Sequence, residues 1–169
     1  MEDPTESLHD EIQEKAEESL KQKERTWAVV AITTALIAVF AAISSLMAGH
    51  YSNEAMIDQI RASDQWAFYQ AKGIKAEIQA LGAVLGKSDP AEVSRYKKEQ
   101  DEIKTEADKF QKESAEYLER HVSLSRSVTI FQIAIAISAI AILIKRKFLW
   151  YCSIVLALAG IFLFAMGML

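Results

Sequence analysis

The chain has 169 residues and a formal net charge of −4, with 51% hydrophobic and 25% charged residues. These averages combine two populations, because the ranges 27–47, 128–144 and 148–169 contain none of the 19 basic and 23 acidic residues. Such a distribution excludes an ordinary soluble domain and indicates a membrane protein with a charged extramembrane part. The acidic balance argues against nucleic acid as a partner.

Helices are favoured throughout, because the chain has only six Gly and two Pro and β-rich folds need many more turn residues. We therefore predict an all-α membrane protein with three transmembrane helices and a long antiparallel helical (coiled-coil) hairpin between the first and second spans. Cys152 is the single cysteine and has no partner for an internal disulfide. In chain order, the predicted segments are an acidic N-terminal segment (1–26), the first span (27–47), the extramembrane hairpin (48–127) with its turn at 86–90, the second span (128–144) and the third span (148–169).

The N-terminal segment carries nine acidic and four basic residues. Asp3, Pro4 and Glu6 form a helix-start signal, with a capping oxygen, a proline in the first turn and a glutamate three positions after the cap. A docking helix for a cytoplasmic partner is one interpretation, and a solvated helix leading into the membrane is the one we favour. The first span is 21 residues long, which corresponds to about 31 Å of helix, and we interpret it as an uncleaved anchor.

Small residues recur on one face of the first span, at alternating spacings of four and three. Small side chains let helix backbones approach closely in lipid, so this stripe predicts a contact between copies of the chain. The alternative is that the stripe packs on the chain's own other spans. If the helix continues without a break into the hairpin, the same seven-residue repeat reaches the aromatic cluster around Trp66. The predicted oligomer interface comprises Ala31, Ala35, Ala38, Ala42, Ser45, Gly49, Trp66, Tyr69, Gly73 and Ala80.

The extramembrane hairpin has two helix-competent arms, 48–85 and 91–127, on either side of a turn marked by Gly86, Asp89 and Pro90. Each arm shows hydrophobic residues at alternating spacings of three and four, which is the pattern of a coiled-coil seam. Folding at the turn would place Ile60 near Tyr117 and Ala67 near Phe110. The predicted seam comprises Ile57, Ile60, Asp64, Ala67, Ala71, Ile74, Ile78, Leu81 and Leu85 on the first arm, and Val93, Tyr96, Gln100, Ile103, Ala107, Phe110, Ser114, Tyr117, His121 and Leu124 on the second.

Two polar residues interrupt apolar patterns. Asp64 lies in the predicted seam, near Ser114 or Tyr117, where it is either a buried ion site or, as we favour, a register-fixing contact to a hydroxyl. Gln132 is the most polar side chain inside a predicted span. It either bonds to a neighbouring helix, which we favour, or lines a pore.

The last two spans are separated by the basic run 145–147 and form a membrane hairpin, with aromatic anchors at Phe148, Trp150 and Tyr151. Six basic residues flank the spans on the side of the N-terminus and the basic turn, against two on the other side. The excess places the N-terminus in the cytoplasm and residues 48–127 outside it, in a periplasm or its equivalent.

Catalytic, cofactor-binding and metal-ligating patterns are not found in the sequence, so we predict a protein that is not an enzyme and has no cofactor. The three histidines, His9, His50 and His121, make a poor metal site because His9 is predicted on the opposite side of the membrane. The acidic run 99–108 alternates with lysines and is typical of a solvated helix face.

The run 64–72 (DQWAFYQAK) resembles the central motif of the bacterial family called domain of unknown function 4337. The layout is also similar, with a charged N-terminus, one span, two charged helices and a terminal pair of spans split by basic residues. The resemblance covers most of the chain after about residue 24. It implies a bacterial membrane setting and no specific activity.

These patterns favour a non-enzymatic, self-assembling scaffold or organising protein of the bacterial inner membrane. Its expected partners are the lipid bilayer, further copies of the chain and other membrane proteins. The alternative is a channel-forming or accessory subunit of a membrane transport complex, with Gln132 and Ser138 beside a narrow path.

Overall fold

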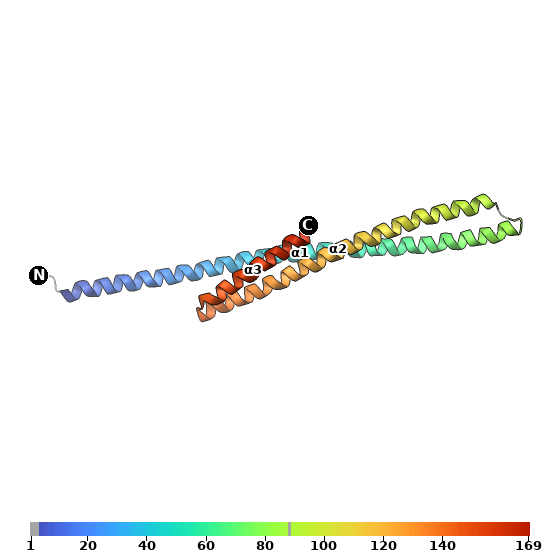
Figure 1. The fold of residues 1–169 in the computed structure, drawn as a ribbon. Helices are drawn as coiled ribbons and strands as arrows, with labels where there is room; N and C mark the ends of the chain where they lie inside the picture. Colours follow the sequence, from blue (N-terminus) through green and yellow to red (C-terminus); the bar gives the residue numbers. More distant parts are fainter. Residues whose placement is uncertain (1–3, 88) are drawn as a thin grey trace. The chain divides into compact units, whose positions relative to one another are not determined.

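The computed structural model describes residues 4–87 and 89–169, and the side chains of residues 13–87, 89 and 91–169. Three helices account for nearly all of them: α1 (Pro4–Val84), α2 (Pro90–Ile144) and α3 (Lys147–Met168) (Figure 1). The described residues contain no strand, which confirms the predicted all-α class. By length and composition, each helix contains a segment able to cross a membrane.

The chain divides into two compact units, one of Met1–Ser45 with Ser125–Ala165 and the other of Leu46–Leu124 with Met166–Leu169. Helices α1 and α2 each contribute to both units and continue without a break between them. The predicted limits of the spans at 47 and 128 therefore mark changes in composition rather than helix ends.

In the first unit, parts of α1, α2 and α3 pack around Phe131, which is fully buried. The ring fits only because residue 160 is glycine: a Cβ atom there would lie 2.6 Å from a ring carbon of Phe131. Polar contacts also join the helices, since the hydroxyls of Thr34 and Ser138 are hydrogen-bonded and Trp150 Nε1 donates to Thr33 Oγ1 at 3.1 Å. Around Phe131 the buried core contains Ile37, Ala41, Ala134 and Ala157.

The turn between α1 and α2 has the residues that its geometry requires. Gly86 has a φ of 66°, a left-handed conformation that glycine adopts without a steric cost. The amide of Lys87 donates to the carbonyl of Gly82 at 2.8 Å, which caps the end of α1 as in a Schellman motif. Asp89 Oδ1 accepts a bond from the amide of Ala91 at 2.9 Å and caps the start of α2.

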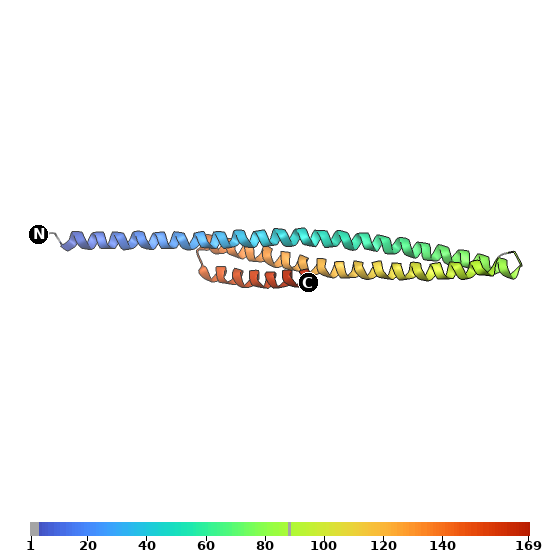
Figure 2. The same ribbon diagram turned by 90° about the horizontal axis from the view of Figure 1, so that it is seen from above.

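In the second unit, the two arms of the hairpin run antiparallel and side by side (Figure 2). Three hydrogen bonds set their register: Ser114 Oγ donates to the carbonyl of Ala55 at 2.7 Å, His121 Nδ1 lies 2.8 Å from the carbonyl of Ala48, and Gln100 Nε2 donates to the carbonyl of Tyr69 at 3.2 Å. On the second arm every residue of the predicted seam is buried or half-buried, namely Val93, Tyr96, Gln100, Ile103, Ala107, Phe110, Ser114, Tyr117, His121 and Leu124.

The predicted seam of the first arm is wrong. All nine of its residues are exposed, namely Ile57, Ile60, Asp64, Ala67, Ala71, Ile74, Ile78, Leu81 and Leu85. The second arm packs instead on a different face of α1, where alanine recurs every seventh residue at Ala48, Ala55 and Ala62 and again at Ala76. The partner side chains explain this choice. Tyrosine, phenylalanine and glutamine on α2 need small residues opposite them, and Ser114 and Gln100 bond directly to the α1 backbone.

Because α2 packs on the alanine face of α1, its aromatic residues have other neighbours than predicted. Tyr117 stacks on Tyr51, with ring centroids 6.0 Å apart, rather than on Ile60. The ring of Phe110 lies beneath the guanidinium of Arg61 at 5.7 Å rather than beside Ala67.

Candidate functional site

The small-residue stripe of the predicted first span is exposed. Ala31, Ala35, Ala38, Ala42, Ser45 and Gly49 all lie outside the chain's own packing. The residues that face the other helices are their neighbours, including Val30, Ile37, Ala41 and Ser44, which are buried. The alternative expectation, that the chain's own spans cover this stripe, is therefore wrong.

The part of the predicted interface that follows residue 49 is placed differently. Trp66, Tyr69 and Gly73 are half-buried within the hairpin, and a Cβ atom on Gly73 would lie 2.7 Å from Gln100 Nε2. Trp66 meets Tyr69 edge-on, with ring centroids 5.5 Å apart. Gln100 of the second arm bonds to the carbonyl of Tyr69 and lies against Gly73, so these two positions take part in the contact between the arms, whereas Ala80 is exposed.

The hairpin instead leaves a different apolar surface uncovered, which we call the outer face of the first arm. Ile74 is 59% exposed, Leu81 67% and Phe68 60%. In the row of this face from Ile57 to Leu85, which alternates steps of three and four, only Asp64 is charged. The exposed residues Arg61, Lys75 and Glu77 lie beside that row. The outer face comprises Met56, Ile57, Ile60, Asp64, Ala67, Phe68, Ala71, Ile74, Ile78, Leu81, Val84 and Leu85.

The second arm presents a contrasting exterior. Its exposed positions carry alternating charges, with ion pairs along the helix such as Lys109–Glu113 at 3.8 Å. Such a surface is typical of a helix face in water. The exposed charged residues of the second arm include Lys97, Lys98, Asp101, Glu102, Lys104, Glu106, Asp108, Lys109, Lys112, Glu116 and Glu119. One hairpin therefore has an arm with a charged exterior and an arm with one exposed apolar face.

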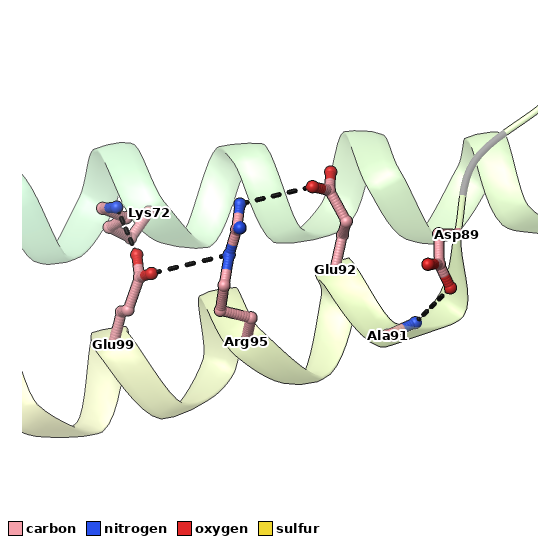
Figure 3. A network of polar contacts seen from close by, with 6 residues as sticks. All are labelled: Lys72, Asp89, Ala91, Glu92, Arg95 and Glu99. Carbon is pink, nitrogen blue, oxygen red and sulfur yellow. Dashed lines mark hydrogen bonds and ion pairs between the residues drawn. The ribbon is translucent and has the colours of Figure 1, made fainter.

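A polar network joins the two arms near the turn (Figure 3). Glu99 pairs with Lys72 across the interface and with Arg95 one helical turn away at 3.6 Å, and Arg95 also reaches Glu92 at 3.3 Å. The hydrogen bond from Lys72 lowers the pKa of the Glu99 carboxyl, despite partial burial that opposes it. The hydrogen bond with Tyr96, together with Glu92, raises the pKa of Arg95.

The buried carboxylate of the hairpin is Asp58, not Asp64. Asp58 is only 4% exposed and pairs with Arg61 at 3.1 Å, whereas Asp64 is exposed and Ser114 bonds to Ala55. The predicted contact between Asp64 and Ser114 is therefore wrong. The seven-residue spacing that links Tyr51, Asp58, Gln65 and Lys72 with the alanine row would have revealed this face in the sequence.

The histidines and Gln132 do not come together in one site. His121 bonds within the hairpin, the ring of His50 lies 5.4 Å from that of Tyr51, and His9 has no described side chain. Gln132 is exposed on α2 and does not point into the helix bundle. Among the described side chains, no group of three or more His, Cys, Asp or Glu residues is placed to hold a metal ion.

Among comparisons with known proteins, only the one with protein families finds a match. No curated protein and no solved structure matches the chain. The model of one protein family matches residues 26–169, which include all three helices and both units beyond the acidic N-terminal segment. The chain therefore belongs to the family described as Domain of unknown function (DUF4337).

Proposed function

We propose that this protein is a non-enzymatic scaffold of the bacterial inner membrane, which assembles with copies of itself and organises other membrane components. The observation that carries the proposal is the exposed small-residue stripe of the first span. Six small residues on one face lie free of the chain's other helices, directly beside residues that those helices bury.

Lipid tails are as apolar as leucine, so apolar burial does not drive helices together in a bilayer. Association there depends on close packing, and only small side chains let two backbones approach closely. A helix that served only as an anchor would have no need for a regular row of alanines. In the same span the large exposed side chains occupy a different face, which includes Ile32, Leu36 and Val39.

In this proposal the spans lie at 27–47, 128–144 and 148–169, the N-terminus is cytoplasmic, and the hairpin projects into the periplasm as a coiled coil. The basic residues of the turn at 145–147 and of the N-terminal flank favour this orientation. A projecting helical pair has a large surface for its size, which suits a protein that positions others.

Mass photometry of the full-length protein in lipid nanodiscs tests self-assembly. We expect several copies per particle for the wild type and fewer for Ala38→Leu, because the added atoms would separate the backbones. Ala139→Leu is the matched control, since Ala139 is an exposed alanine on α2 outside the stripe. A wild type that is monomeric in lipid would refute the proposal.

Gly73→Leu and Trp66→Ala are unsuitable for this test, although both residues belong to the predicted oligomer interface. Gly73 lies against Gln100 and Trp66 is half-buried beside Tyr69, so replacing either residue changes the packing of a single chain as well.

A channel-forming or accessory transport subunit is the second candidate, and the exposure of Gln132 favours it. A polar side chain that points away from the chain's own bundle is available to line a path between copies. Conductance in reconstituted bilayers that is lost in Gln132→Leu would support this candidate. A flat current trace from the purified oligomer would exclude it.

A further inference from the structure

We propose that the outer face of the first arm binds the same face of a second copy, so that two α1 helices pair in parallel outside the membrane. This inference rests on the proposed function, because it requires two chains in one bilayer. It adds a second contact surface, and nine of its twelve residues are those that the sequence predicts between the two arms.

The spacing of the outer face is that of a helix–helix seam. Its inner row, from Ile57 to Leu85, alternates steps of three and four over four heptads, which is the repeat that packs one helix against another. The first arm therefore carries two seams on different faces. The alanine seam is filled by the second arm, and the larger seam has no partner within the chain.

The exposed area is large enough for a stable contact. Eight aliphatic side chains and Phe68 on the outer face keep between 42% and 85% of their surface exposed. With roughly 60–120 Å² for an aliphatic side chain and about 200 Å² for a phenylalanine, the face offers on the order of 500 Å² of apolar surface per copy. Complete burial of the face on both copies would remove about 1,000 Å² of apolar surface, which is the lower limit for a specific interface.

A second copy is the occupant that fits this face. The exposed surface of the second arm is charged, so it offers no apolar partner for the outer face of a neighbouring molecule. The outer face of another first arm is the apolar surface that every copy provides. Both first arms leave the same bilayer in the same direction, so they pair in parallel and each residue meets its equivalent.

Parallel pairing places Asp64 opposite Asp64 of the second copy. Two carboxylates at such a position repel each other, so the wild-type contact is weaker than the apolar pattern alone would give. Arg61 is the nearest cation on the same helix, one turn away, and it is already paired with Asp58. Asp64→Asn is therefore expected to tighten the association of full-length protein about 5-fold or more, as the removal of one close like-charge contact predicts.

Cysteine cross-linking of the full-length protein in nanodiscs tests the contact. In a Cys152→Ser background, single cysteines are placed in neighbouring pairs: Ile60→Cys with the control Gln59→Cys, and Leu81→Cys with the control Ala80→Cys. All four positions are exposed in one chain, and only the first of each pair lies on the outer face. We expect disulfide-linked dimers for Ile60→Cys and Leu81→Cys, formed at least ~10-fold faster than for the controls, because the two outer faces are in contact.

The outcomes separate this inference from the proposed function. Oligomers in mass photometry, with cross-linking equal at all four positions or absent, would overturn the inference and leave self-assembly intact. Cross-linking only between the Ile60→Cys and Leu81→Cys variants when mixed would overturn the parallel arrangement. A monomeric wild type would overturn both proposals, and a weaker association of Asp64→Asn would overturn the equivalent pairing.

Discussion

Ala62→Leu tests which face of α1 packs against the second arm. Ala62 is 1% exposed and belongs to the alanine row that faces α2. Three added carbon atoms have no space there, and such overpacking costs about 1–3 kcal/mol. Ala67→Leu makes the same chemical change five residues further on, on the outer face, which is exposed in a single chain. In protein diluted in detergent to one copy per particle, such a surface substitution changes stability by about 0.5 kcal/mol or less.

Hydrogen exchange of the full-length protein, followed by mass spectrometry, measures the opening of the hairpin directly. A loss of 1–3 kcal/mol should accelerate exchange of the amides in both arms by about 5- to 150-fold in Ala62→Leu, and by about 2-fold or less in Ala67→Leu. Faster exchange in Ala67→Leu with little change in Ala62→Leu would show that the larger seam, not the alanine row, lies between the arms.

Three further results are expected. Gly160→Leu should destabilise the first unit by at least ~1–3 kcal/mol in a thermal melt, because the new side chain meets the ring of Phe131. Gly86→Ala should accelerate exchange near the turn, since its φ of 66° costs an L residue about 1–2 kcal/mol. Because the pKa of Glu99 is lowered in the folded hairpin, its pair with Lys72 stabilises the hairpin fully at pH values above 4.5, the ordinary pKa of a glutamate carboxyl. That contribution should disappear as the pH falls through the lowered pKa, and Glu99→Gln should remove this part of the acid dependence.

Each of these changes has a control within the chain. Ala159→Leu adds its atoms at an exposed neighbour of Gly160, and Gly49→Ala adds a methyl group where no atom lies within 4 Å. Glu102→Gln removes an exposed carboxylate from the same helix as Glu99. Equal effects in a variant and its control would contradict the corresponding structural explanation.

The sequence predicted the helical class, the turn and the second arm because each depends on strong local signals. Few residues other than glycine fit the left-handed helix end at Gly86, and few cap a helix start as well as Asp89 does. On the second arm a single apolar row stands among charged residues, so only one face can be buried. In that arm composition and packing agree.

The first arm was assigned wrongly because it carries two rows with the same period. A hydrophobicity rule selects the row with the larger side chains, here the one containing Ile74 and Leu81. The contact selects the row that fits the large side chains of α2, such as Tyr117 and Phe110, and therefore the alanines. Only the partner helix determines that choice, although alanine at every seventh residue was a visible signal.

The distribution of small residues inside the hairpin and large residues outside it affects how its stability responds to concentration. The alanine row of the first arm contributes little apolar burial of its own when the arms close, while the large apolar side chains of the outer face stay exposed. If a second copy supplies that burial, association stabilises the folded hairpin by mass action. The stability of each hairpin then depends on the number of chains per unit area of membrane. Dilution of the protein in lipid should therefore lower that stability.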